Sequence, residues 1–224
     1  MRTFLMVLIA ASLLGSLGCA SDGGGGIRLG SERSFDGLVK VENARVSAAW
    51  VRPDFDLSGY TRVMLEGAGI EFRPVERAGA GRRQFPLSDN ATRRIGEIME
   101  SAFRDELARS DRFELTDAPG PDVLILWGGL LDVVSFVPPR TSGRDDVVLR
   151  RLGEATLVIE LRDSESRATL ARIMDRRPLE SVSGGFRANS VNGFGEFRQL
   201  ARSWARLVRR RLDEAPTLQA AQQP

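Results

Sequence analysis

The segment DVLILWGGLLDVVSFV, residues Asp122–Val137, is almost continuously apolar, and Gly128-Gly129 interrupts it near the middle. The turn residues Pro119-Gly120-Pro121 precede it. An apolar run that is bounded by such turn residues is typical of a strand buried on both faces. We therefore predict that this segment is the central strand of a sheet.

The sequence on either side contains five further segments with the composition or the alternation of strands. In Glu154–Arg162 the apolar residues recur at every second position, and the turn Asp163–Ser166 leads into a partner strand. Gly67-Ala68-Gly69 interrupts another of these segments and indicates a bulge. The five predicted strands are Ala44–Val51, Tyr60–Arg73, Phe113–Thr116, Glu154–Arg162 and Ala168–Arg176.

Two segments have the apolar period of amphipathic helices. The first begins after the N-cap residue Ser88 and extends to about Ser110, and the second extends from about Gly195 to Asp213 and ends before Pro216. These elements predict an α+β fold with two layers, in which two amphipathic helices pack on one face of a mostly antiparallel, mixed sheet. We expect a single domain over residues 34–215 and a disordered tail over residues 216–224.

The composition of the 224 residues excludes several classes of enzyme and metal site. The chain has no histidine, and Cys19 and Lys40 are its only cysteine and lysine, so nearly all of its 32 basic residues are arginine. Catalytic triads with an imidazole base, zinc sites with histidine ligands and an intrachain disulfide are therefore impossible. The net charge of +2 is too small for a dedicated nucleic-acid-binding protein, and we expect no nucleic-acid partner and no cofactor.

The first 18 residues are predicted to be a signal peptide. Arg2 supplies a positive charge, and the apolar run Phe4–Leu17 is too short to span a bilayer but has the length of a signal-peptide core. Leu17-Gly18-Cys19 resembles the lipobox of bacterial lipoproteins, although Ser16 stands where that family usually has leucine. The resemblance implies cleavage before Cys19 and a diacylglyceryl group on its sulfur, which would make the membrane a partner through the lipid anchor. Alternatively, a standard signal peptidase would cut after Ala20 and release the domain.

Residues 19–33 are predicted to be a flexible tether, because Gly23–Gly26 and the polar residues that follow lack any periodicity. A flexible chain of this length has an end-to-end distance of about 20 Å, which keeps the domain close to its membrane. In the sorting of lipoproteins, an aspartate directly after the cysteine favours retention in the inner membrane. Ala20 occupies that position, so we expect the outer membrane, with the domain facing the periplasm, if the organism is Gram-negative.

Several short motifs between Phe35 and Asp213 are similar to those of a family of uncharacterised bacterial lipoproteins. They are Phe35-Asp36-Gly37-Leu38, Arg52-Pro53-Asp54 with Leu57-Ser58-Gly59-Tyr60, Pro119-Gly120-Pro121-Asp122, Leu161-Arg162-Asp163-Ser164, Leu170-Ala171-Arg172, and the Trp204-Ala205 helix that ends in Arg211-Leu212-Asp213. Such families are described as domains of unknown function. The resemblance therefore bears on location and fold, and it transfers no catalytic residue.

Carboxylate chemistry is the one enzymatic route that the composition leaves open. Four carboxylates could in principle supply an acid and base pair that acts on peptidoglycan or another glycan. They are Asp132, Glu154, Glu160 and Asp163. Glu154 and Glu160 lie on the polar face of the alternating segment, and Asp163 begins a turn, so solvated carboxylates are the simpler interpretation.

Two loops have weak ligand-binding patterns. Asp54–Gly59 opens like a calcium loop, but Leu65 occupies the position of the bidentate glutamate, so we interpret the loop as a polar turn. Ala78–Arg83 offers glycines and arginines to a phosphate, but it lacks the lysine and the strand-loop-helix context of a P-loop. Neither loop is predicted to hold a metal or a cofactor.

The last predicted helix carries a row of arginines. Its apolar stripe contains Phe197, Leu200, Ala201, Trp204, Leu207 and Val208, and on the opposite face Arg198, Arg202, Arg206 and Arg210 follow one another at i+4 spacing. Like charges at this spacing repel each other by a few tenths of a kcal/mol per pair. Two interpretations are open: a solvated face of an arginine-rich protein, or a surface that docks anionic lipid headgroups or an acidic partner.

These observations favour a non-enzymatic lipoprotein of the cell envelope, in which a membrane-anchored α+β domain binds another envelope protein as an accessory. The anchor, the short tether and the lack of a convincing catalytic set support this hypothesis. The alternative is a carboxylate-dependent enzyme that acts on peptidoglycan or glycan, and it rests on the four carboxylates alone.

Overall fold

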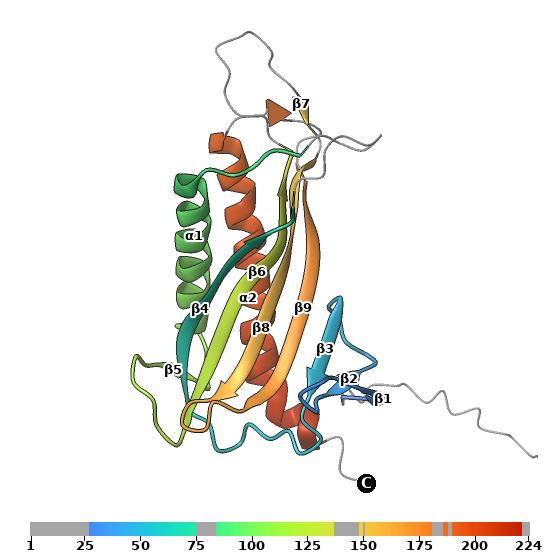
Figure 1. The fold of residues 1–224 in the computed structure, drawn as a ribbon. Coiled ribbons are helices and arrows are strands. Elements are labelled where there is room, and N and C mark those ends of the chain that lie inside the picture. The colour runs from blue at the N-terminus through green and yellow to red at the C-terminus, as the bar shows by residue number, and fades with distance from the viewer. Residues whose placement is uncertain are drawn as a thin grey trace, which may run out of the picture.

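The computed structural model describes residues 27–74, 84–136, 148–149, 151–180, 186–187 and 190–220. One eight-stranded sheet has the strand order β1-β2-β3-β9-β8-β6-β4-β5 (Figure 1). Its strands are β1 (Leu29–Arg33), β2 (Val39–Val41), β3 (Ala48–Val51), β4 (Arg62–Phe72), β5 (Glu114–Leu115), β6 (Val123–Ser135), β8 (Arg151–Asp163) and β9 (Thr169–Glu180). A separate two-stranded ladder pairs β7 (Val148–Leu149) with β10 (Phe186–Arg187).

The sheet is mixed and mostly antiparallel. Strand β4 runs parallel to its neighbours β5 and β6, and the other neighbouring strands are antiparallel. The two helices, α1 (Asp89–Leu107) and α2 (Ser190–Ala220), lie on one face of this sheet (Figure 1). The predicted α+β class, with two helices on one face of a mixed sheet, is therefore confirmed.

Strand β6 is the predicted central strand, and it lies between β8 and β4. Leu124, Leu126 and Leu130 belong to the hydrophobic core beneath the helices. Val123 and Ile125 point to the other face, which we call the outer face, and they are fully buried as well. Burial on both faces explains why the run is continuously apolar rather than alternating.

The two helices bury apolar stripes at the predicted positions. Helix α1 begins after Ser88, whose Oγ accepts a hydrogen bond from the backbone N–H of Ala91, as expected of an N-cap. The core beneath the helices contains Ile95, Ile98, Ala102, Phe103 and Leu107 of α1 and Phe197, Ala201, Trp204, Ala205 and Val208 of α2. Neither of the two described helices combines the length and the hydropathy that a membrane span requires.

The N-terminal strands differ from the prediction. Residues 29–33 were expected to belong to the flexible tether, but they form β1, which pairs with β2. Strand β2 pairs with β3, and β3 pairs with β9, so the three short strands extend the sheet at one edge. Strand β3 lies within the predicted strand Ala44–Val51, whereas β1 and β2 are only five and three residues long, too short to show a period. They are held in the sheet by pairing with each other and with β3.

Helix α2 is longer than predicted at both ends. It begins at Ser190 rather than Gly195, and it continues beyond Pro216 to Ala220. A proline removes one backbone hydrogen bond to the preceding turn, but its own φ is compatible with a helix, so it does not force the chain to leave the helix. The expected tail over residues 216–224 is therefore helical over residues 216–220, and residues 221–224 lie outside the described part.

Candidate functional site

The four carboxylates of the enzyme alternative do not form one site. Arg73 lies between two of them, because its guanidinium is 3.7 Å from the Asp132 carboxylate and 2.7 Å from the Glu154 carboxylate. Glu160 is held elsewhere by two other arginines, and Asp163 accepts hydrogen bonds from the Tyr60 hydroxyl and from Ser166. Asp132 and Glu154 therefore share Arg73, whereas Glu160 and Asp163 are held by other partners.

The surroundings of Glu154 and Asp163 favour their ionised forms. Burial opposes the ionised form of Glu154, but the hydrogen bonds from Arg73 and Arg176 outweigh it and lower its pKa. Hydrogen bonds from the side chain and the backbone of Ser166 lower the pKa of Asp163. A general acid that protonates a glycosidic oxygen needs a raised pKa, so these two residues are poorly suited to that role.

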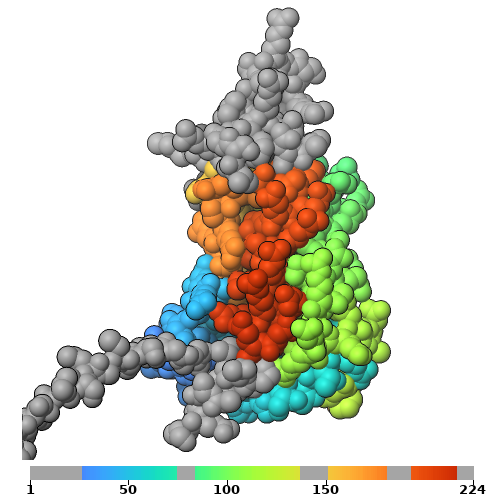
Figure 2. All heavy atoms as spheres, turned by 180° about the vertical axis from the view of Figure 1, so that it is seen from behind, coloured from blue at the N-terminus to red at the C-terminus, as the bar shows by residue number. Residues whose placement is uncertain are grey.

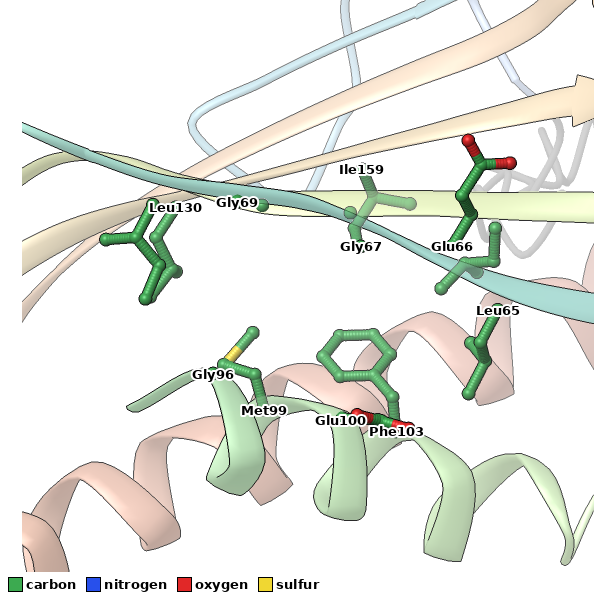
Figure 3. Close-up of a pocket in the computed structure, with 14 residues that line it drawn as sticks. Leu65, Glu66, Gly67, Gly69, Gly96, Met99, Glu100, Phe103, Leu130 and Ile159 are labelled. Atoms are coloured by element: carbon green, nitrogen blue, oxygen red, sulfur yellow. The ribbon is translucent and has the colours of Figure 1, made fainter. Parts of the chain in front are cut away.

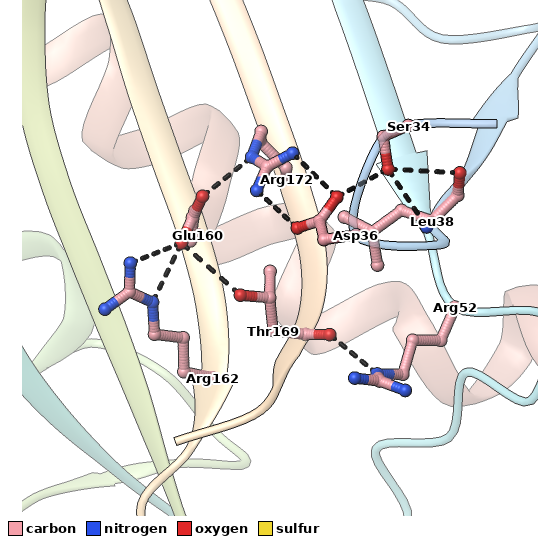
Figure 4. A network of polar contacts seen from close by, with 8 residues as sticks. All are labelled: Ser34, Asp36, Leu38, Arg52, Glu160, Arg162, Thr169 and Arg172. Atoms are coloured by element: carbon pink, nitrogen blue, oxygen red, sulfur yellow. Dashed lines mark hydrogen bonds and ion pairs between the residues drawn. The ribbon is translucent and has the colours of Figure 1, made fainter.

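A network of polar contacts crosses the outer face of the sheet (Figure 4). The Glu160 carboxylate accepts hydrogen bonds from Arg162 Nε at 2.8 Å and from Arg172 Nε at 2.7 Å. The other edge of the Arg172 guanidinium forms a two-bond contact with Asp36, with distances of 3.3 and 2.6 Å. Arg172 therefore connects β8 and β9 to the turn between β1 and β2, which lies 136 residues away in the sequence.

That turn contains the Phe35-Asp36-Gly37-Leu38 motif. The Ser34 hydroxyl donates to the Asp36 carboxylate at 2.6 Å, and the N–H of Leu38 donates to the same hydroxyl at 3.0 Å. Gly37 has a φ of 83°, a left-handed conformation that favours glycine. Leu38 is fully buried, whereas the Phe35 side chain is 96% exposed and lies above the Arg172 guanidinium.

The arginines of the α2 row, which are Arg198, Arg202, Arg206 and Arg210, are all exposed. Arg206 is 3.8 Å from the Glu106 carboxylate of α1. The other three have no ion pair with any residue that the structure describes. Figure 2 shows α2 running along the middle of this side of the molecule, between α1 and β9, with its outer surface uncovered.

Glu106 joins the two helices beneath one end of this row. It is only 4% exposed. Its carboxylate forms ion pairs with the guanidinium groups of Arg109 at 3.2 Å and Arg209 at 3.5 Å, in addition to Arg206. The sequence reasoning missed Glu106, because an acidic residue on an amphipathic helix is normally assigned to the solvated face. The basic residues opposite it on α2 were the only signal that could have identified the contact.

The other predicted positions are of two kinds. Cys19 and the loop Ala78–Arg83 involve residues outside the described part of the chain. In the loop Asp54–Gly59, the Asp56 carboxylate accepts hydrogen bonds from the backbone N–H and the hydroxyl of Ser58, both at 2.8 Å. These bonds form the polar turn that was predicted there.

Comparisons with known proteins place the sequence in a family. It matches the family model described as "Protein of unknown function (DUF3313)" over residues 30–208, and no curated protein matches it. Among solved structures, a minor lipoprotein from Acinetobacter baumannii is 13% identical, with a TM-score of 0.35, over 70% of this chain and 93% of that chain. A PelC dodecamer from Paraburkholderia phytofirmans is also 13% identical, with a TM-score of 0.34, over 66% of this chain and 89% of that chain. Because the family model covers most of the sequence, the chain belongs to the DUF3313 family of proteins of unknown function.

Proposed function

We propose that this protein is a non-enzymatic binding domain of the cell envelope, anchored to the outer membrane through a lipidated Cys19. In this proposal the α2 row docks the domain to an acidic envelope protein. The observation that carries the proposal is the exposed charge of Arg198, Arg202 and Arg210, which no described carboxylate neutralises.

This part of the chain is unusual in its charge balance. The segment from Phe197 to Leu212 contains six arginines and no acidic residue. On the outer face of the sheet, by contrast, the arginines are ion-paired with carboxylates, namely Arg73, Arg162, Arg167, Arg172 and Arg176. On α2, Arg206, Arg209 and Arg211 are likewise paired, with Glu106, Asp213 and Glu214, so the positive charge without a described partner is that of Arg198, Arg202 and Arg210.

The geometry of the row favours a protein partner over a bilayer. Residues four apart on an α-helix are rotated by about 40° relative to each other, so the row turns by about 120° between Arg198 and Arg210, over about 18 Å. A flat bilayer surface would contact only part of such a row. A protein surface that curves around the helix can place carboxylates against all four guanidinium groups, and bidentate pairs of this kind fix orientation as well as charge.

The lipobox-like Leu17-Gly18-Cys19 supports the anchor, and Ala20 supports the outer membrane. An exposed docking surface on a tethered domain gains from the anchor, because the tether raises the local concentration of the domain near membrane partners. The enzyme alternative is less well supported, since Glu154 and Asp163 are held in their ionised forms.

The anchor predicts the chemistry of the mature N-terminus. In protein purified from membranes, mass spectrometry of the N-terminal peptide is expected to show a start at Cys19 and the added mass of a diacylglyceryl group. A Cys19→Ser variant is expected to lose this modification and its retention in the membrane fraction. An unmodified start at Ser21 would contradict the anchor and support ordinary secretion.

The docking surface is tested with a photo-crosslinking amino acid at Gln199, which is exposed between Arg198 and Arg202. In cells, we expect a crosslink to an acidic envelope protein, and the triple change Arg198→Gln, Arg202→Gln and Arg210→Gln is expected to abolish it. Each exposed ion pair contributes at most about 1 kcal/mol, so the loss of three should weaken binding about tenfold to a hundredfold.

The matched control changes Arg28, Arg33 and Arg45 to glutamine. These arginines are also exposed and lie on the N-terminal strands and their connections, so the control removes the same charge from another surface. The crosslink should survive in this variant. Equal loss of the crosslink in both triple variants would contradict the proposal, because only the net charge would then matter. The proposal would also fail if the domain floated with phosphatidylglycerol vesicles and the α2 triple variant alone did not, because the partner of the row would then be a bilayer.

A further inference from the structure

A cavity of about 390 Å³ lies between α1 and the β4–β6 part of the sheet (Figure 3). Its wall is mainly apolar, and Figure 3 shows Met99 and Phe103 pointing from α1 toward the sheet and Leu65 and Leu130 pointing from the sheet toward the helix. The size falls within the range of about 300–1,000 Å³ that is typical of ligand sites.

The five glycines in this wall have different physical reasons for being glycine. A Cβ on Gly128 would lie 2.7 Å from the Ile159 side chain, and a Cβ on Gly129 would lie 2.7 Å from the Gly69 carbonyl oxygen. Gly69 has a φ of 91°. Close packing against backbone requires glycine at Gly129, and backbone conformation favours it at Gly69, whereas at Gly128 the Ile159 side chain would have to shift.

Gly67 and Gly96 have neither requirement. A Cβ on either residue would meet nothing within 4 Å, and neither has a left-handed backbone. Glycine inside a strand or a helix destabilises it relative to alanine, because the unfolded chain has more conformations to lose. The two glycines therefore make β4 and α1 less stable than alanine would, and their missing side chains leave open space at the wall of the cavity.

The cavity has an opening at the sheet edge. Strand β5 pairs with β4 only at Arg62 and Val63, so the following part of β4 has no strand on its other side within the described residues. Gly67 and Gly69 of this part are exposed. A ligand can therefore enter between β4 and α1 without unfolding either element.

The lining favours an uncharged, elongated ligand. It extends from Leu65 to Ile70 along β4, which is about 16 Å, and from Gly96 to Phe103 along α1, which is about 10 Å. The two carboxylates of the lining are already paired, Glu66 with Arg167 at 2.8 Å and Glu100 with Arg104 at 3.5 Å. Figure 3 also shows Glu66 turned to the other side of the sheet. The wall thus offers apolar contact along its length and no charge of its own to bind an ion.

We propose that this cavity binds the aliphatic chain of an uncharged, single-chain amphiphile, with the polar end of the ligand at the opening near Gly67. The site is separate from the α2 row, so it stands or falls independently of the proposed docking function.

The test uses the full chain with ¹³C-labelled methionine methyl groups and 1-monolauroylglycerol, an uncharged lipid with one twelve-carbon chain. Met99 lines the cavity, whereas Met64 and Met174 lie on the outer face of the sheet, since their neighbours Val63, Leu65 and Ile173 face the helices. We expect a saturable shift of the Met99 methyl resonance, identified with Met99→Leu, and no shift at Met64 or Met174.

Two variants fill the space that the glycines leave. Gly96→Leu and Gly67→Val are each expected to abolish the Met99 shift and to raise the Tm by about 2 °C, since they remove glycine from a helix or a strand. Gly195→Leu is the matched control, because Gly195 lies in α2, outside this wall, and a Cβ there also meets nothing within 4 Å. It should leave the shift unchanged.

Three results would overturn the proposal. The first is the absence of a Met99 shift in the wild type, and the second is an unchanged shift in both filled variants that remain folded. The third is a shift of Met99 with phosphatidylcholine vesicles but not with 1-monolauroylglycerol, which would assign the site to a bilayer chain instead.

Discussion

Replacing Trp204 with alanine is expected to lower the free energy of unfolding by about 3–5 kcal/mol, which is the usual cost of truncating a large buried aromatic side chain. Trp204 is fully buried in the core between α2 and the sheet. Its Nε1–H also donates a hydrogen bond of 2.9 Å to the carboxylate of Asp175 on β9, which is 6% exposed. The change therefore creates a cavity and removes a donor from a buried carboxylate. Urea denaturation followed by circular dichroism measures the effect.

A Trp204→Phe variant separates these two contributions. Phenylalanine retains most of the apolar volume and lacks the N–H, so the expected loss is about 1–3 kcal/mol, the cost of a buried acceptor that loses a donor. Asp175 keeps its contact with Arg177 at 2.6 Å, which limits the penalty. If the alanine variant loses less than 1 kcal/mol, then Trp204 does not join α2 to the sheet in the way described.

The second large effect is expected for Arg172→Met, which should lower the free energy of unfolding by about 3–5 kcal/mol. The side chains of Arg172, Glu160 and Asp36 are 15%, 9% and 25% exposed, so two carboxylates lose a shared partner in a largely desolvated place. Methionine keeps an unbranched apolar stem and removes the charge. At about 2–4 °C per kcal/mol, the Tm should fall by about 10 °C in a thermal scan.

Arg167→Met is the matched control. Arg167 also makes a two-bond contact with a carboxylate, that of Glu66, with both distances at 2.8 Å, but the two side chains are 48% and 36% exposed. Exposed pairs contribute about 0–1 kcal/mol. Equal effects of the two substitutions would mean that burial does not determine the strength of these pairs, which would contradict the argument.

The same contact makes stability depend on pH. The hydrogen bond from Arg172 lowers the pKa of Asp36 below its usual value of 3.8, so the stability from this pair is fully present above that value and is lost as the pH falls through the lower pKa of the folded state. The difference in unfolding free energy between the wild type and Asp36→Asn should therefore be constant at neutral pH and shrink in acid. A difference that grows in acid would have the wrong sign.

Local patterns were sufficient to predict the elements that form the core. Burial on both faces gave β6 its continuous apolar run, Ser88 capped α1 as predicted, and Trp204 lies in the stripe that its helical spacing indicates. The register of β4 and β6 also shifts between Gly67 and Gly69, where the bulge was predicted. These features depend on neighbours in sequence, which is why the sequence reports them.

Other features depend on residues that are distant in sequence. Nothing in the pattern around Asp36 indicates that Arg172 will reach it, because that contact exists only once β9 and the N-terminal strands share a sheet. Likewise, Gly67 and Gly96 have no visible relation until α1 lies over β4. The cavity was therefore missed, although glycines in neighbouring strands and in the covering helix are a pattern that could be searched for.

The pairing of β3 with β9 has a consequence for the order of folding. Ala49 lies opposite Ile173, so the first strands of the chain have no place in the sheet until more than a hundred further residues have been synthesised. Contacts this distant in sequence are expensive in loop closure and form late. The N-terminal strands should thus dock after the β6–β8–β9 unit has formed, and a chain that emerges N-terminus first would remain open to chaperones and to protease until its last third arrives.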